Sequence, residues 1–174
     1  MRTQQSGFTM IEVLVTIGIL VVGLLGLAAL QTLTTVSELE AYQRSQAIVL
    51  VRDMADRMNG NKMNLSSYIT SPDVGTSAAS CATLTGAALD LCEWGNELNG
   101  ASEKQAGTTN IGAMIGARGC VVMVDPQTFL VTVAWQGMSK AAIPKEACGQ
   151  GAYGDDSQRR TVSTLVRVAL LAAS

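Results

Sequence analysis

The pattern of apolar and polar residues divides the chain into a long N-terminal helix and a mixed region after it. Residues 13–30 carry no charge and only one polar side chain, Thr16. At about 1.5 Å per residue, a helix of this length just spans the hydrocarbon core of a bilayer. A short polar stretch, residues 1–6, precedes it. The pattern therefore predicts a membrane-spanning helix close to the start of the chain.

The same helix is predicted to continue well beyond the apolar run. No Gly or Pro occurs between Leu30 and Met58, and Asn59-Gly60 supplies a stop signal. Apolar residues recur in this stretch at spacings of three, four or their sums, which indicates one stripe that packs against a head domain. The stripe consists of Val36, Leu39, Ala47, Leu50, Met54 and Met58.

The rest of the chain is predicted to contain a short helix between two loops. Residues 61–80 and 100–118 are rich in Gly, Ser, Thr and Asn, which is typical of surface loops. Between them, Thr85 is placed to cap a helix that ends at Asn99-Gly100. The apolar face of that helix consists of Ala87, Leu91, Trp94 and Leu98.

Three strands are predicted after the second loop. Residues 120–124 and 128–135 are rich in β-branched residues, and the turn Asp125-Pro126-Gln127 joins them as an antiparallel hairpin. In the second strand, Phe129, Val131, Val133 and Trp135 share one face. A long loop, 137–158, leads to a last strand over 160–171. A long helix followed by an antiparallel sheet predicts an α+β fold.

Composition and charge argue against several classes of function. The net charge is −2, the pI is near 5.1 and no run of Lys or Arg occurs, so we expect no nucleic-acid partner. Histidine, the commonest general base, is absent, and neither a G-x-S-x-G nor an S-x-x-K motif is present. We therefore expect a protein that is not an enzyme and that uses no cofactor.

Neither of two candidate metal sites has the ligand pattern that its metal requires. The four cysteines lie far apart in sequence, whereas structural zinc sites favour close pairs such as C-x₂-C. Asp155-Asp156 lies in a glycine-rich loop that offers oxygen ligands for calcium, but the ligand series of an EF-hand is missing. A solvated turn is the favoured interpretation of that loop. We expect no metal.

The segment Gly7-Phe8-Thr9-Met10-Ile11-Glu12 is the strongest functional signal in the chain. It joins the polar leader to the apolar run and places one carboxylate just inside that run. A carboxylate in lipid is costly and needs a partner, so Glu12 is a functional candidate. An ordinary signal peptide is the alternative, but its cleavage site would follow the apolar region and no acid would lie inside it.

This segment resembles the class III prepilins of type IV pili and the related pseudopilins. The resemblance implies that a prepilin peptidase cuts after Gly7 and that the new terminus, Phe8, is N-methylated. It also implies that Glu12 pairs with the terminal amine of a neighbouring subunit in the filament. The domains expected on this basis are a leader (1–7), a transmembrane or filament-core helix (8–30), the periplasmic half of that helix (31–60) and an α+β pilin head (61–174).

Weaker resemblances point to the minor pilins of the PilV type. They lie in residues 23–28, 90–94, 119–120 and 131–135, which read GLLGLA, DLCEW, GC and VTVAW. The resemblance implies a structural subunit that helps prime pilus assembly near the tip, in an appendage used for cell adhesion and twitching motility. The implied partners are other minor pilins, the major pilin, the prepilin peptidase, a tip adhesin and the inner membrane. The implied location is the inner membrane of a Gram-negative bacterium, with the head in the periplasm, and then the extracellular pilus.

Two alternatives stay open at this point. A minor pseudopilin of a type II secretion system would carry the same processing segment, and an adhesive pilin would contact DNA or a host surface through its head. A basic loop bearing aromatic residues would favour DNA contact, and the sequence shows none.

The cysteines are expected to form disulfides, because the chain after the membrane helix faces the oxidising side of the inner membrane. Four cysteines allow three connectivities. Local pairing favours Cys81 with Cys92 and Cys120 with Cys148. The second bridge is expected to fasten the long loop to the sheet.

Overall fold

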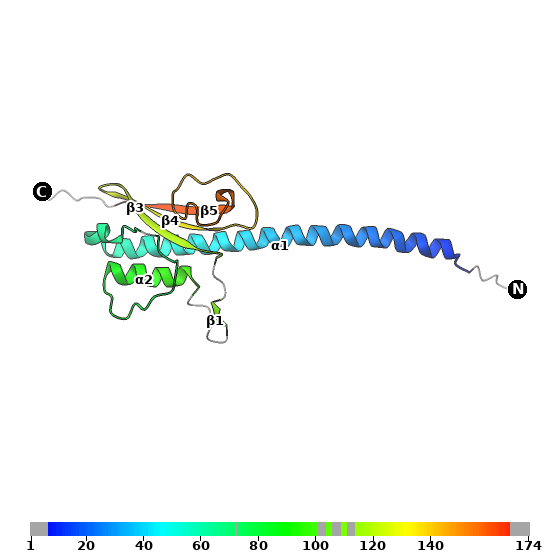
Figure 1. Ribbon diagram of the computed structural model, residues 1–174, viewed down its shortest axis with the longest axis horizontal. Helices are drawn as coiled ribbons and strands as arrows, with labels where there is room; N and C mark the ends of the chain where they lie inside the picture. Colours follow the sequence, from blue (N-terminus) through cyan, green and yellow to red (C-terminus); the bar gives the residue numbers. More distant parts are fainter. Residues whose placement is uncertain (1–6, 72, 101–103, 106–108, 111–113, 168–174) are drawn as a thin grey trace. The chain divides into compact units, whose positions relative to one another are not determined.

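The computed structural model describes residues 7–71, 73–100, 104–105, 109–110 and 114–167 (Figure 1). Contacts divide the chain into two compact units, residues 1–39 and residues 40–174. The elements in chain order are α1 (Met10–Gly60), η1 (Lys62–Tyr68), α2 (Ala87–Leu98), β1 (Lys104–Gln105), β2 (Thr109–Asn110), β3 (Arg118–Asp125), β4 (Thr128–Gln136), η2 (Asp156–Gln158) and β5 (Arg159–Arg167).

Helix α1 begins at Met10, inside the Gly7–Glu12 segment, and ends at the predicted stop. The Thr9 carbonyl accepts the first helical hydrogen bonds, from the backbone N–H groups of Glu12 and Val13. In the second unit α1 turns one face inward, and this face consists of Gln43, Ala47, Val51, Met54 and Met58. Their spacing of three and four residues is that of one side of a helix.

The predicted apolar stripe was partly wrong. Leu39 is exposed and Val36 is half-buried. Both belong to residues 1–39, outside the unit that holds the head. The buried face begins at Gln43 instead and includes Val51, which the spacing argument missed. A polar Gln at the start of the stripe gave no apolar signal.

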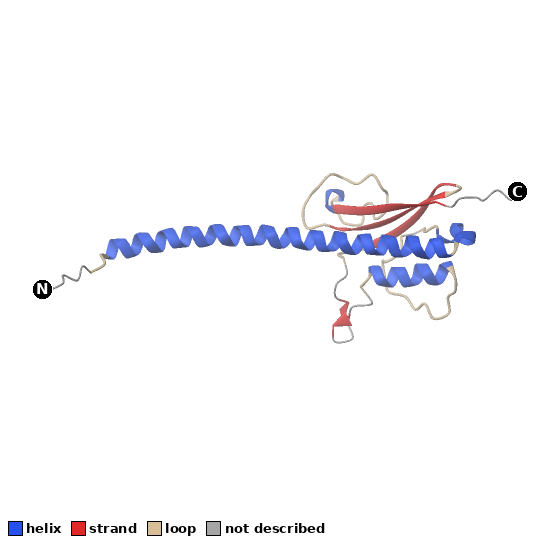
Figure 2. Ribbon diagram, turned by 180° about the vertical axis from the view of Figure 1, so that it is seen from behind, coloured by secondary structure: helices blue, strands red, loops and turns tan. Residues whose placement is uncertain are grey.

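Strands β3, β4 and β5 form an antiparallel sheet in that order (Figure 2). Val121 pairs with Val131, which in turn pairs with Thr164, so β4 is the central strand. The predicted hairpin is present, with a register shift between Met123 and Asp125. Residues 168–171 of the predicted last strand lie outside the described residues. The long helix packed against this sheet confirms the predicted α+β fold.

Strand β4 is covered on both faces. Phe129, Val131, Val133 and Trp135 lie in the main core together with the inward face of α1. On the opposite face Thr128, Thr132 and Ala134 are also buried. Ala134 clusters there with Cys120 and Cys148. The long loop that carries Cys148 therefore covers the face of the sheet away from the helix.

Helix α2 packs beside the second half of α1 through Trp94. This side chain is fully buried, and its indole Nε1 donates to the Leu50 carbonyl of α1 at 2.9 Å. Gly119 at the start of β3 allows the close approach, because a Cβ atom there would lie 2.3 Å from the Trp94 ring. The predicted cap was wrong: Gly86 occupies the N-cap position of α2, and no side chain caps the helix.

The two predicted surface loops contain short elements. Residues 61–80 begin with η1, whose Leu65 and Tyr68 are buried. Within residues 100–118, β1 and β2 form a two-residue antiparallel pair. Loop composition alone concealed both features, because isolated apolar residues and two-residue strands leave no periodic pattern.

Candidate functional site

The predicted processing segment lies in the open at the start of the helix. Gly7, Phe8 and Thr9 are outside any helix or strand and are exposed, and 81% of Phe8 is accessible. Residues 1–6 of the predicted leader lie outside the described residues. The peptide bond between Gly7 and Phe8 therefore lies outside regular structure in an exposed stretch, where a peptidase can reach it.

Glu12 lies in the first turn of α1, three residues after Thr9. An acid at this end of a helix interacts favourably with the partial positive charge of the free backbone N–H groups. Within the described part of the chain no basic side chain forms an ion pair with Glu12. Its pairing with the amine of a neighbouring subunit stays a prediction.

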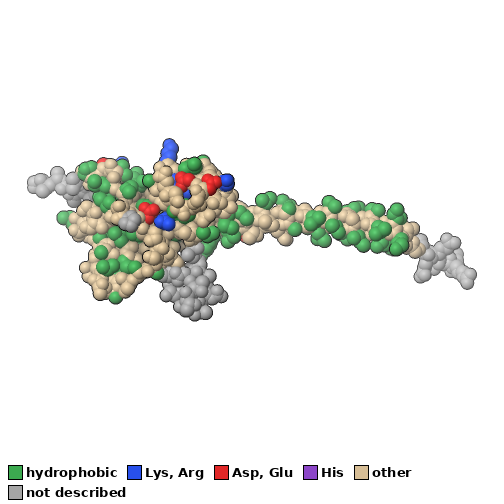
Figure 3. Space-filling view, in the orientation of Figure 1, with side chains coloured by type: hydrophobic (Ala, Val, Ile, Leu, Met, Phe, Trp, Pro, Cys, Tyr) green, Lys and Arg blue, Asp and Glu red, His purple; other side chains and the backbone are tan. Residues whose placement is uncertain are grey.

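The first half of α1 exposes its apolar side chains. Helix α1 is the one helix among the described residues that is long and apolar enough to cross a membrane, and none of its most apolar stretch is buried. Figure 3 shows hydrophobic side chains along this part of the helix. Exposure on this scale is unfavourable in water, so the surface is built to contact lipid or other apolar helices.

Comparisons with known families match the two parts of α1 and the start of the head. The prokaryotic N-terminal methylation motif matches residues 2–28, which include Gly7, Phe8 and Glu12. The family described as type IV pilin Tt1218 matches residues 29–97. Residues 29–97 are therefore similar to a type IV pilin family, and residues 2–28 carry the methylation motif. Neither a curated protein nor a solved structure shows a significant match.

This similarity bears on several of the expectations. The matched type IV pilin family is one of structural proteins and not of enzymes, in agreement with the sequence-based expectation. The methylation motif implies processing by the prepilin peptidase and assembly with other pilins. The apolar helix agrees with a prepilin held in the inner membrane and later carried into a pilus. The individual roles of Gly7, Phe8 and Glu12 stay predictions.

The head, which follows α1, contains two disulfides. Cys81 is joined to Cys92, and Cys120 to Cys148, with Cα atoms 5.8 Å apart in each bridge. The first bridge ties the loop before α2 to that helix. The second ties β3 to the loop after the hairpin, so the loop covers the outer face of β4.

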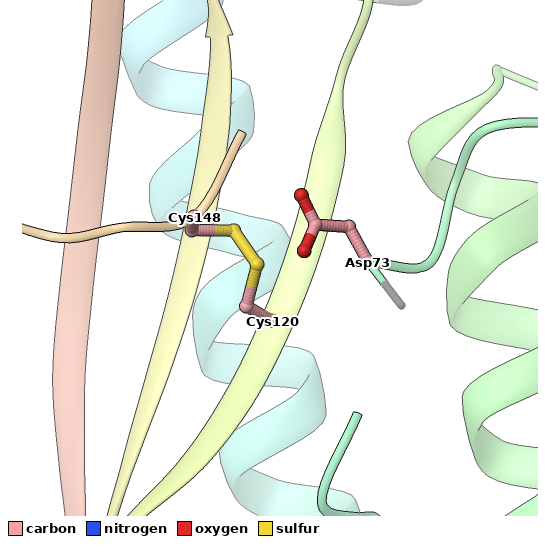
Figure 4. A group of neighbouring side chains, drawn as sticks. All are labelled: Asp73, Cys120 and Cys148. Atoms are coloured by element: carbon pink, nitrogen blue, oxygen red, sulfur yellow. A yellow bond between two sulfur atoms is a disulfide. The ribbon is translucent and has the colours of Figure 1, made fainter. Parts of the chain in front are cut away.

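Asp73 lies beside the second disulfide, and Figure 4 shows its carboxylate directed toward the sulfur atoms. A carboxylate oxygen of Asp73 and the Sγ atoms of Cys120 and Cys148 lie within 4.8 Å of one another. Three such groups resemble a metal-binding set, but the two sulfurs are bonded to each other and offer no thiolate. The Asp73 carboxylate accepts a hydrogen bond from the Gly149 N–H at 2.9 Å instead.

The long loop after the hairpin is organised by a buried arginine, Arg159. Its side chain is 1% exposed and forms a bidentate ion pair with Asp156, at 2.7 and 2.8 Å. It also donates to three backbone carbonyls of the loop, those of Pro144, Glu146 and Cys148. One guanidinium therefore holds three points of a segment that has little regular structure.

Asp155 and Asp156, the candidate calcium ligands, both form ion pairs with cationic side chains. Asp156 pairs with Arg159, and Asp155 pairs with Lys140 at 2.8 Å and accepts from the Ser157 N–H. The hydrogen bond from Lys140 holds the pKa of Asp155 below its usual range, and Arg159 likewise lowers the pKa of Asp156. This arrangement fits the favoured interpretation of a structured polar turn.

A second arginine, Arg57, joins α1 to α2. It lies within ion-pair distance of Asp53 on its own helix and of three acids on α2, which are Asp90, Glu93 and Glu97. Tyr68 of η1 donates to Asp90. Burial, and next the negative charge of Asp53, raises the pKa of Glu97.

Sequence reasoning missed Asp73, Arg57 and Arg159. Each is a single charged residue with partners far away in the sequence, although Arg57 also pairs with Asp53, four residues earlier, and Arg159 with Asp156, three residues earlier. The Asp-x-x-Arg spacing after the glycine-rich run is a local signal by which the ion pair in this loop could have been found.

Proposed function

We propose that this protein is a minor pilin that helps prime pilus assembly and enters the filament near its tip. The observation that carries the proposal is the Gly7–Glu12 segment at the start of an exposed apolar helix, joined to a small disulfide-bonded head. The resemblance of residues 23–28, 90–94, 119–120 and 131–135 to the PilV type supports the minor class.

In this proposal the peptidase cleaves after Gly7, and Phe8 becomes the methylated terminus. The Glu12 carboxylate then forms a charge-assisted pair with the amine of a neighbouring subunit, because an unpaired acid is costly among apolar helices. The exposed helix supplies the remaining contacts. The chain is held in the inner membrane with its head in the periplasm before it enters the pilus.

Three helical glycines support close packing by neighbouring helices. Gly18, Gly23 and Gly26 lie on α1, and a Cβ atom built at any of them meets nothing within 4 Å. Small residues let the backbones of neighbouring helices approach closely in lipid. We propose that other minor pilins and the major pilin contact α1 here, and that the exposed side of the head contacts further subunits, including a tip adhesin.

Deletion of the gene followed by counting of surface pili tests the priming role. We expect few or no pili, and we expect their number to recover when retraction is disabled, because a priming subunit lowers the barrier to initiation without being required for growth. Normal piliation with lost export of folded enzymes would instead support the alternative of a minor pseudopilin in type II secretion. Normal piliation with lost adhesion or lost DNA contact would support an adhesive pilin.

Replacing both Gly23 and Gly26 with Leu tests the helix contacts. The added side chains should keep neighbouring helices apart and so weaken co-purification with other minor pilins. Val21→Leu, on the same helix, is the matched control because it adds bulk without filling a glycine position. Equal recovery of partners with the double variant would exclude packing at these glycines.

A further inference from the structure

The two disulfides of the head lie in opposite chemical surroundings. Cys81 Sγ lies 3.2 Å from the Asn96 side-chain Nδ2, which carries hydrogens. The Cys120 and Cys148 sulfurs instead lie beside the Asp73 carboxylate. An N–H donor stabilises a thiolate, whereas a carboxylate destabilises it. The two bridges should therefore differ in their reactivity toward thiols.

Asn96 is fixed next to Cys81 by the backbone of Ala79. The Asn96 amide donates to the Ala79 carbonyl and accepts from the Ala79 N–H, each at 2.8 Å. These two contacts therefore establish which atom of the Asn96 amide is the oxygen and which is the nitrogen. The amide nitrogen that faces the sulfur is held in place, and no rearrangement is needed for it to meet a developing negative charge.

Access to the two bridges also differs. Cys92 lines a cavity of about 480 Å³ between the 69–80 loop and α2, together with the apolar side chains of Leu84 and Leu91. Cys120 and Cys148 line a smaller cavity of about 160 Å³, which also contains Asp73 and Glu146. Asp73 borders both cavities, but its carboxylate lies against the sulfurs of the smaller one.

We propose that the Cys81–Cys92 disulfide is a thiol-exchange site, at which an external dithiol attacks Cys92 and Cys81 departs, while Cys120–Cys148 stays oxidised. The cavity brings the reagent to Cys92 Sγ. The Asn96 amide stabilises Cys81 as the leaving sulfur, and a leaving thiol that is a better thiolate departs faster. Both carboxylates in the smaller cavity repel an incoming thiolate.

The reaction balances as an exchange of two electrons. One thiolate of the dithiol bonds to Cys92 Sγ, and the Sγ–Sγ bond breaks with its electron pair on Cys81. The second thiolate of the reagent then attacks its own mixed disulfide, which releases Cys92 as a thiolate and closes the reagent into a disulfide. Both cysteines take up protons, so the bridge is reduced and the dithiol is oxidised. The covalent tie between the loop and α2 is lost, while the second bridge still holds the sheet.

A timed reduction of the full chain in detergent tests the proposal. Dithiothreitol is added at low concentration, free thiols are trapped with N-ethylmaleimide, and labelled positions are found by peptide mass spectrometry. We expect Cys81 and Cys92 to be labelled about ten times faster than Cys120 and Cys148. Equal rates, or earlier labelling of Cys120 and Cys148, would overturn the proposal.

A monothiol tests which sulfur is attacked. With glutathione, we expect the mixed disulfide on Cys92 and the trapped free thiol on Cys81. Glutathione found mainly on Cys81 would contradict the assigned leaving group. The position of the adduct is independent of any role in pilus assembly.

Two variants with one control test the electrostatic argument. Asn96→Asp keeps an acceptor for the Ala79 N–H but replaces the donor beside Cys81, so reduction of the first bridge should slow several-fold. Asp73→Asn should speed reduction of the second bridge. Asp125→Asn removes a carboxylate from the exposed hairpin turn and should change neither rate. Circular dichroism establishes that each variant is folded, and unchanged rates in folded Asn96→Asp and Asp73→Asn would exclude the proposed cause.

Discussion

Both halves of α1 carry apolar side chains, but these side chains are exposed in the first half and buried along one face in the second. In the first half, Leu14 and Val22 are 66% and 72% exposed, whereas Val51 and Met54 in the second half are 2% and 0% exposed. The apolar face of the second half packs against the sheet and α2 of the same chain. The first half has no such cover among the described residues, and its stability depends on lipid or on other subunits. We therefore expect substitutions in the second half of α1 to affect folding of the head, and substitutions in the first half to affect assembly of the filament.

The largest expected effect on folding comes from substituting Gly119, because a side chain there destabilises the head and leaves the first half of α1 unchanged. A side chain at this position would collide with Trp94 and Leu98, whose nearest atoms lie 2.3 and 2.7 Å from a Cβ. Gly119→Val should lower the free energy of unfolding of the head by about 3 kcal/mol or more. Urea denaturation followed by tryptophan fluorescence measures this change in the free energy of unfolding. The amount of protein recovered in the membrane fraction should not change.

Gly60→Ala is the control for this substitution. Gly60 ends α1, and a Cβ atom there meets nothing within 4 Å. The unfolding midpoint of the Gly60→Ala protein should equal that of the wild type or be slightly higher. A Gly119→Val protein with the same midpoint as Gly60→Ala would contradict the close packing of α2 on β3.

A pair of truncations on the same helix sharpens the comparison directly. Met54→Ala removes a fully buried side chain and should cost about 2–4 kcal/mol of unfolding free energy. Leu24→Ala removes a side chain that is 63% exposed and should change the value by less than about 0.5 kcal/mol. Leu24→Ala should instead weaken association with other pilins. Equal losses of head stability would show that the first half also belongs to the folded core.

The smallest expected effect concerns pH and the contact between α1 and α2. Glu97 has a raised pKa, chiefly through burial, so the folded head binds its proton more tightly than the unfolded chain does. The stabilisation that this provides is complete below the ordinary value of 4.5 and is lost as the pH rises through the folded pKa. Because Glu97 is partly exposed, the effect should stay below about 1 kcal/mol.

Glu97→Gln tests this through the difference between the two proteins across a pH series. The wild type should lose stability relative to the variant as the pH rises from about 4.5 toward neutrality. Asp156, whose pKa is lowered by Arg159, gives the opposite dependence of stability on pH. This contribution is the same in both proteins, so it cancels when their free energies of unfolding are subtracted. Parallel curves for the two proteins would contradict the raised pKa.

Features with a periodic or local signature were predictable from the sequence. The apolar run, the stop at Gly60 and the shared core face of Phe129, Val131, Val133 and Trp135 depend on neighbouring residues, and the structure has each of them. The start of the buried face at Gln43 was missed, because it depends on where the head meets the helix and not on composition. The cap at Gly86 was missed because Thr85 fits the statistical preference equally well.

The residues of the candidate site also fall into those with a local sequence signature and those without one. Gly7, Phe8 and Glu12 form one short segment, which made them visible as a motif. The contacts of Arg57 with α2 and of Asp73 with Gly149 join residues that lie 33 to 76 positions apart, so no local pattern marks them. Long-range polar contacts of this kind are set by the packing of elements, which a single sequence does not display.

The amino terminus of the protein in a pilus fraction tests the central claim, that the first half of α1 is built for assembly after processing at Gly7. Mass spectrometry of the intact chain should find a mature protein that begins at Phe8 and carries one added methyl group. A chain that begins at Met1, or one cut after the apolar run, would contradict the account.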